Sequence, residues 1–243
     1  MNGRHLRPVT DELALHYSPL VRAAIHTMRY IETYGPIGLT PAKALKRYFV
    51  EWAAEAFVWP HYTAADLHAV NKVLNEQDFL PLVMLHDLMI STRLTRYYKG
   101  AMALAKQGRD LVDEPARLWH LLTTAFLWRT DHGRTMRRHD QFDGDWELIL
   151  GVIDREAHEG ASDDRIYAAI LGMSEEQARR DHLLTASLYT HVLRPLTYAG
   201  LLAEVRTGTG IGMRHIYWKT PLWHAALRLP TDEPLSHIVR VFR

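Results

Sequence analysis

The sequence contains no cysteine and no long apolar run, and each absence excludes a class of structure or chemistry. Without cysteine the chain has no disulfide, no cysteine-ligated zinc and no thiol nucleophile. A membrane-spanning helix needs about 18 or more consecutive apolar residues, and no such run occurs. The N-terminus also lacks the apolar segment of a signal peptide. We therefore expect a cytoplasmic protein without contact to a membrane.

The chain also has little net charge. Its 29 Lys and Arg against 28 Asp and Glu leave a formal charge of +1, so no global field attracts DNA. Any nucleic-acid site must then be a local patch. An apolar fraction of 47% and a length of 243 residues allow one large domain or two ordinary ones, each with its own core.

The starts of the helices are marked by capping residues. Ser18-Pro19 and Thr40-Pro41 each place an N-cap before a proline at the first helical position. Thr63 with Asp66, and Ser174 with Gln177, have the spacing of capping boxes. With apolar periodicity, these signals predict helices over residues 19–34, 41–57, 64–75, 78–90, 116–129, 146–158, 163–171, 175–193, 196–204 and 221–229.

Two hairpins interrupt the helices. Residues 92–96 and 101–105 read as strands around a tip at 97–100, and 215–219 reads as a strand after a glycine-rich tip at 207–212. The stretches 85–111 and 196–227 therefore form an approximate internal repeat. The sequence predicts a mainly α protein with small β-hairpins (α+β), divided into an N-terminal arm (1–17), a first domain (18–113) and a second domain (114–243).

This order resembles the winged-helix plan, in which helices come first and a two-stranded wing follows the last one. The phrase Ala199-Gly200-Leu201-Leu202, followed by Arg206, looks like the end of a third helix that runs into a wing. The segment 37–49 is also similar to uncharacterised bacterial proteins of this kind. The resemblance covers residues 18–113 and 115–229, and it implies a DNA-binding or regulatory module made of two winged-helix-like domains.

Both candidate wings are locally basic. Residues 93–109 hold five basic residues, two tyrosines and no acid, and residues 206–224 also lack an acid. Phosphate contacts need positive charge, and arginine binds phosphate oxygens with two parallel hydrogen bonds. The candidate nucleic-acid contacts lie on the two wings, on one face of the predicted helix 41–57 and in the loop 134–138. They are Lys43, Lys46, Arg47, Arg93, Arg96, Tyr97, Lys99, Lys106, Arg134, Arg137, Arg138, Arg206, Arg214 and Lys219.

The candidate recognition helix limits this hypothesis. Residues 79–90 offer only His86 and Asp87 as polar groups, so the helix cannot read base edges in the ordinary way. Contact with duplex DNA would then go through the backbone phosphates. The alternative is a module that binds a protein partner or a second copy of itself, with wings whose charges serve solubility.

His86-Asp87 also resembles the doublet of the helical HD-domain metal phosphohydrolases. In that family an upstream histidine, the doublet and a later aspartate bind a divalent metal. Here His68 would be the upstream ligand, and Asp110 or Asp113 the later one. The sequence departs from the family pattern because no glycine follows the doublet and predicted strands come directly after it. We therefore expect no enzyme activity and no cofactor, and keep the phosphohydrolase as a lower alternative.

Overall fold

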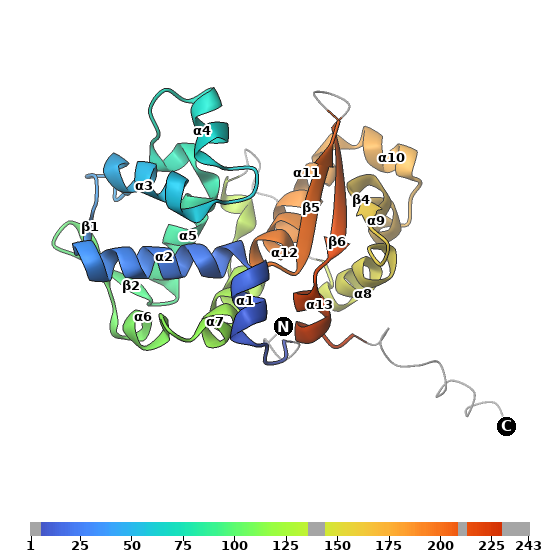
Figure 1. Ribbon diagram of the computed structural model, residues 1–243. Helices are drawn as coiled ribbons and strands as arrows, with labels where there is room; N and C mark the ends of the chain where they lie inside the picture. The colour runs from blue at the N-terminus through green and yellow to red at the C-terminus, as the bar shows by residue number, and fades with distance from the viewer. Residues whose placement is uncertain (1–5, 136–143, 209–212, 230–243) are drawn as a thin grey trace. The chain divides into compact units, whose positions relative to one another are not determined.

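The structure is a computed structural model that describes residues 6–135, 144–208 and 213–229 (Figure 1). It is an α+β protein with two small antiparallel sheets. The described residues form two compact units: the first is Pro8–Thr130, and the second joins Leu6 and Arg7 to the described residues from Asp131 onward. No helix in the described ranges combines the length and the apolar character needed to cross a bilayer.

The first unit is built from helices around one three-stranded sheet. Its strand order is β1-β3-β2, and both pairings are antiparallel. In chain order its elements are α1 (Asp11–Tyr17), α2 (Pro19–Tyr34), β1 (Ile37–Gly38), α3 (Arg47–Phe57), α4 (Ala64–Val70), the 3-10 turn η1 (Glu76–Asp78), α5 (Leu80–Ser91), β2 (Thr95–Tyr98), β3 (Ala101–Leu104), α6 (Lys106–Leu111) and α7 (Pro115–Trp128).

The second unit repeats this arrangement. A short strand again pairs with the second strand of a hairpin, in the order β4-β6-β5, and all pairings are antiparallel. Its elements are the 3-10 turn η2 (His132–Thr135), α8 (Trp146–Glu156), β4 (Ala161–Ser162), α9 (Asp163–Leu171), α10 (Glu175–Arg180), α11 (His182–Leu188), the π-helical turn η3 (Tyr189–Leu193), α12 (Arg194–Ala199), β5 (Leu202–Thr207), β6 (Arg214–Lys219) and α13 (Pro221–Ala226).

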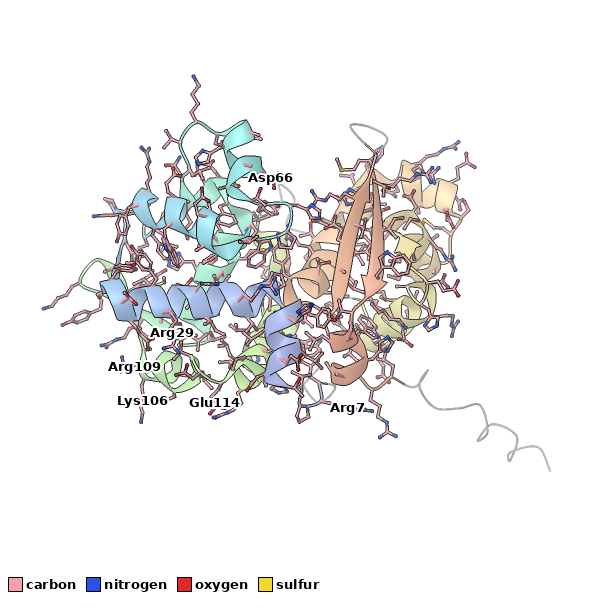
Figure 2. The ribbon with its side chains drawn as sticks, viewed as in Figure 1. Arg7, Arg29, Asp66, Lys106, Arg109 and Glu114 are labelled. Atoms are coloured by element: carbon pink, nitrogen blue, oxygen red, sulfur yellow. The ribbon has the colours of Figure 1, made fainter. Side chains whose placement is uncertain are left out.

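Local capping explains where several helices begin. The Ser18 hydroxyl accepts a hydrogen bond from the Val21 N–H at 3.3 Å, and α2 starts at Pro19. Thr63 and Asp66 form the reciprocal capping box of α4. Asp66 is labelled in Figure 2. Ser174 and Gln177 do the same for α10.

The boundaries of the units differ from the predicted domains. Helix α7 was expected to open the second domain, but it lies in the first unit and packs against α1 and α2. The cause is its apolar face, where Leu118, Trp119 and Phe126 are fully buried. Part of the expected N-terminal arm is the helix α1, whose N-terminus is capped by Thr10.

Helix α3 begins at Arg47 and not near residue 41. The preceding residues form a tight loop in which the Thr40 N–H donates to the Ala44 carbonyl at 2.8 Å and Lys43 has a φ of +64°. The Leu45 N–H is bound to the carboxylate of Glu76 at 2.6 Å, so it cannot join a helix. Because Lys43 and Lys46 precede the helix, the prediction that Lys43, Lys46 and Arg47 share a helical face is wrong.

Two other predicted helices are divided or shortened. The stretch 175–193 is broken at Asp181, whose side chain caps α11, and it ends in the π-helical turn η3. The stretch predicted as helix over 196–204 is helical only to Ala199. Gly200 follows with a φ of +83°, a conformation that ends a helix, and the chain enters β5 at Leu202.

Candidate nucleic-acid interface

The hairpin of the first unit ends in a two-residue turn. Tyr98 pairs with Ala101, which leaves Lys99 and Gly100 as the two central residues. Their φ values of +47° and +73° are both positive, as a type I′ turn requires. The turn holds Lys99 at the exposed tip of the hairpin.

One face of this hairpin is exposed and carries an aromatic ring between cations. Side chains alternate along a strand, so Arg96 and Tyr98 share the outer face, opposite Ala103 and Ala101. The Arg96 guanidinium and the Lys99 Nζ each lie 5.3 Å from the centroid of the Tyr98 ring. The two alanines are small, so the charged groups stand on a flat surface.

Lys46 adds a third cation to the same face. Gly38 of β1 lies opposite Ala101, which lies opposite Tyr98, so the three residues form one row across the sheet. A Cβ placed on Gly38 would come within 3.0 Å of Lys46 Cδ, which shows that the lysine stem lies over this glycine. Two strand spacings, about 10 Å, separate Gly38 from Tyr98 along the row. We call Lys46, Arg96, Tyr98 and Lys99 the wing face.

The other face of the hairpin is tied to the loop that precedes α3. The Tyr97 hydroxyl lies 3.3 Å from His86 Nε2, and His86 Nδ1 lies 2.6 Å from a carboxylate oxygen of Glu76. The second oxygen of Glu76 accepts the Leu45 N–H, and the Lys43 Nζ lies 5.5 Å from the Tyr97 ring centroid. This chain of contacts places Lys43 beside the hairpin.

Tyr97 stays neutral in this arrangement. Burial raises the pKa of its hydroxyl, and the nearby carboxylates of Asp87 and Glu76 raise it further. A proton on His86 Nδ1, facing the Glu76 carboxylate, leaves Nε2 to accept a hydrogen bond from the Tyr97 hydroxyl. The imidazole is buried within the unit and has a hydrogen-bonding role there.

The alternative metal site is not assembled. His86 uses both nitrogens within this cluster, and His68 uses its own for Glu51 at 3.1 Å and the Asn71 carbonyl at 3.3 Å. Asp87 is exposed. Over residues 6–135, 144–208 and 213–229, no three or more His, Asp or Glu side chains gather as a metal site would require. The predicted ligand set His68, His86 and Asp87 is therefore not brought together.

Other cations near the first hairpin have contacts or positions of their own. The Arg47 Nε donates to the Asn75 side-chain oxygen at 3.0 Å. Arg93 and Lys106 line a separate hollow at the base of the hairpin. Figure 2 shows Lys106 and Arg109 on α6, where Arg109 donates to the Leu104 carbonyl at 3.2 Å.

The second hairpin offers fewer free charges. Lys219 is buried, and its Nζ donates to Asp154 Oδ1 at 2.8 Å and to the Asp154 carbonyl at 2.7 Å. It holds strand β6 to helix α8, so the prediction that Lys219 contacts phosphate is wrong. Arg206 donates to Glu204 at 3.0 Å and is partly exposed, whereas Arg214 is exposed at the start of β6.

The predicted loop contacts lie largely beyond what the structure describes. Arg134 falls in η2, while Arg137 and Arg138 lie outside the described residues. Tyr98 belongs to the wing face but was not among the contacts predicted from the sequence. Its spacing of two from Arg96 was the available signal, because strand residues i and i+2 share a face.

Comparisons with known proteins identify both units. The model of the Y4jL N-terminal domain matches residues 16–117, and that of the y4jL C-terminal domain matches residues 136–221. The uncharacterized protein y4jL of Sinorhizobium fredii (strain NBRC 101917 / NGR234) is 38% identical over 148 residues, which cover 60% of this chain and 67% of that protein. No solved structure matches. Each matched domain contains one of the two hairpins.

Proposed function

The chain belongs to the y4jL family, and we propose that it is a non-catalytic, nucleic-acid-associated module that contacts the backbone phosphates of duplex DNA through the wing face. The role implies the cytoplasm, where bacterial DNA lies. The order of elements in each unit supports this proposal. Helices precede a two-stranded hairpin, and an earlier short strand completes the sheet, which resembles the winged-helix plan.

The wing face is the observation that carries the proposal. Three cations from two separate segments gather on one flat, exposed surface of a nearly neutral chain: Lys46, Arg96 and Lys99. The strands beneath them, residues 95–104, contain no acid. Tyr98 is 48% exposed between its two cations, where its ring can lie against a sugar or a base.

The apolar character of α5 determines what kind of binding to expect. Leu82, Leu85 and Leu88 are buried, so the helix is committed to the core and presents no row of polar groups to a groove. Phosphate contacts fix a protein on a duplex without reading its sequence. We therefore propose binding that is weak, salt-dependent and nearly independent of sequence, with a Kd of about 10⁻⁴–10⁻⁶ M.

Fluorescence anisotropy of a labelled duplex tests the proposal with the full chain. Binding near 50 mM salt should weaken steeply near 200 mM, because each phosphate contact releases condensed counterions. The double variant Arg96→Gln/Lys99→Gln should weaken binding to every duplex by a similar factor. Lys72→Gln, which removes an exposed lysine away from the hairpin, is the matched control. Absence of binding at low salt, or equal losses in the control, would contradict the proposal.

A second candidate function rests on the second sheet. Val205 and Trp218 are 47% and 44% exposed on its outer face, on either side of Ile216, and β5 is an edge strand. Exposed apolar edge strands pair readily with another chain. The occupant that fits is a second copy of this chain. Light scattering should then find a dimer that Val205→Lys converts to monomer; a monomeric wild-type chain at about 100 μM, well above a micromolar Kd, excludes this candidate.

A further inference from the structure

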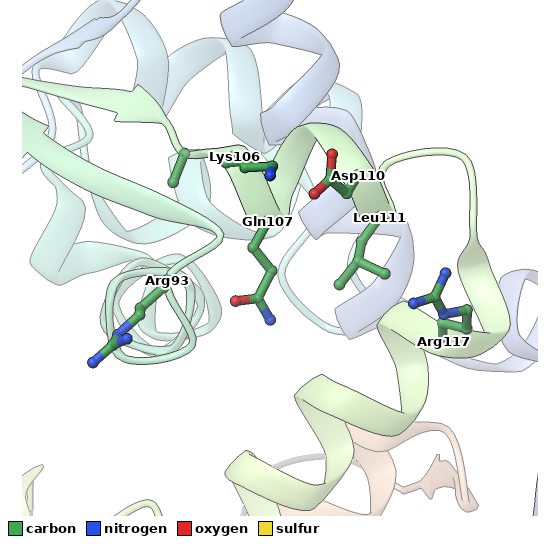
Figure 3. Close-up of a pocket in the computed structure, with 7 residues that line it drawn as sticks. Arg93, Lys106, Gln107, Asp110, Leu111 and Arg117 are labelled. Atoms are coloured by element: carbon green, nitrogen blue, oxygen red, sulfur yellow. The ribbon is translucent and has the colours of Figure 1, made fainter.

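A hollow of about 570 Å³ lies at the base of the first hairpin (Figure 3). It is lined from the turn that follows α5, from α6 and the residue before it, and from the start of α7, all within the first unit. The volume is in the range of sites that hold small molecules. None of the wing-face residues lines it.

The hollow has a rigid wall. A Cβ placed on Gly108 would lie 2.3 Å from the Leu94 carbonyl oxygen, so α6 packs directly against the backbone at the start of the hairpin. The same carbonyl accepts the Ala105 N–H at 3.0 Å. These contacts hold α6 so that Lys106, Gln107 and Asp110 line the hollow, as Figure 3 shows. Such a wall is formed before any ligand arrives.

The lining is positively charged. Arg93, Lys106 and Arg117 bring three cations against the one lining carboxylate of Asp110, a formal charge of +2, and Arg117 also lies 3.7 Å from the carboxylate of Glu114. In the part of the chain that the structure describes, the side chains of Arg93 and Lys106 form no hydrogen bond or ion pair. The Arg93 backbone has a φ of +58°, in the left-handed region that residues with a Cβ rarely adopt.

We propose that this hollow binds the phosphate monoester of a small hydroxyl-bearing molecule, such as a sugar phosphate. Lys106 would hold the phosphate, which carries a charge of about −1.5 to −2 near neutral pH and so matches the sign of the lining. The exposed Arg93 side chain, which points away from Lys106 in Figure 3, would turn toward the phosphate on binding. Asp110 and Gln107 would accept and donate hydrogen bonds to the hydroxyls, while Leu111 forms an apolar wall.

The same charges favour a monoester over the DNA backbone. Each backbone phosphate is a diester with a single negative charge, and Asp110 would lie beside the continuing strand. The phosphate of a free monoester carries nearly twice the negative charge of a diester phosphate. The rest of such a molecule is small and carries hydroxyl groups, which Asp110 can bind. This assignment does not depend on the proposed function, because the ligand and the residues that hold it are different.

Isothermal titration calorimetry of the full chain tests the assignment with ribose 5-phosphate, inorganic phosphate and ribose. We expect ribose 5-phosphate to bind best, inorganic phosphate more weakly and ribose undetectably. Arg93→Asn, which keeps a residue that tolerates the left-handed conformation, and Lys106→Gln should each reduce the affinity tenfold or more. Lys72→Gln should bind as the wild type does. Arg117→Gln serves as a further lining variant if either of the first two lowers the unfolding midpoint.

Three results would overturn the assignment. The first is the absence of binding by ribose 5-phosphate at millimolar concentration. The second is binding that the lining variants leave unchanged. The third is competition, in which ribose 5-phosphate displaces a labelled duplex and Arg93→Asn lowers both affinities equally; the hollow would then belong to a DNA surface. Loss of duplex binding in Arg96→Gln/Lys99→Gln, with sugar phosphate binding intact, supports two separate sites.

Discussion

At the scale of single residues, the tip of the first hairpin holds Lys99 in a conformation that suits asparagine better. Its φ of +47° lies in the left-handed region, where Asn is tolerated and a longer side chain is disfavoured. We predict that Lys99→Asn raises the free energy of unfolding by about 0.5–1 kcal/mol, measured by urea titration. Lys72→Asn, at an exposed position outside the turn, should show no such gain. A Lys99→Asn variant less stable than the wild type would contradict this account.

The buried pair of Glu76 and His86 should be far more sensitive. Both side chains are less than a tenth exposed, and Glu76 also accepts the Leu45 N–H. His86→Ala leaves a buried carboxylate without its main partner, so we predict a loss of roughly 3–5 kcal/mol in unfolding free energy. His68→Ala is the control, because its contact with Glu51 is exposed and worth about 0–1 kcal/mol. Equal losses in the two variants would show that His86 is not a buried anchor.

At the scale of elements, the sequence predicted those helix boundaries and turns that contacts between neighbouring residues determine. The range predicted for α2, 19–34, and that for α9, 163–171, are confirmed because a serine cap starts each helix and a positive-φ glycine follows each one. Gly100 marks the hairpin tip for the same reason, since a glycine readily takes the positive φ that the turn requires. The turn itself is shorter than the predicted tip 97–100, because Tyr97 and Tyr98 pair within β2. Contacts within a few residues are enough to fix such features.

The failed predictions share a different cause, which is contact between distant residues. Helix α3 starts late because Glu76, 31 residues further on, takes the Leu45 N–H. Lys219 looked like a wing cation, but Asp154, 65 residues earlier, binds it inside the unit. Lys46 belongs to the wing face because its side-chain stem lies over Gly38, and not because it shares a helical face with Lys43 and Arg47. None of these partners is visible in the spacing of neighbouring residues.

The second hairpin should respond to acid through Glu204. Burial of its side chain opposes ionisation, but the hydrogen bonds from Arg206 and His215 outweigh it and lower the pKa of Glu204. A carboxyl pKa that is lower in the folded state stabilises the fold at pH values above the ordinary glutamate pKa. This stabilisation is lost as the pH falls through the lower pKa of the folded protein. We predict that Glu204→Gln melts below the wild type at pH 7, and that the difference shrinks below about pH 4.3. A difference that is constant down to pH 3 would exclude this linkage.

At the scale of the whole molecule, the two hairpins repeat one topology but divide their charges differently. The first presents Arg96 and Lys99 outward, with Lys46 beside them. The second uses Arg206 and Lys219 for internal contacts and leaves Arg214 at its exposed edge. With a net charge of +1, the chain has no other large field that would mask this difference. Salt-dependent binding should therefore depend mainly on the first unit.

This division gives a prediction about the slope of log K against log salt concentration. Each phosphate contact contributes about 0.9 to the slope on duplex DNA, so Arg96→Gln/Lys99→Gln should reduce it by roughly 1.8. Arg214→Gln should reduce it by at most about 0.9, and Lys219→Met should leave it unchanged despite a loss of stability. Anisotropy titrations at several salt concentrations measure all three slopes on one duplex. A larger reduction of the slope in Arg214→Gln than in the double variant would mean that the second hairpin, and not the wing face, is the main contact. The slope decides this because it depends on the number of phosphates contacted and not on the overall affinity.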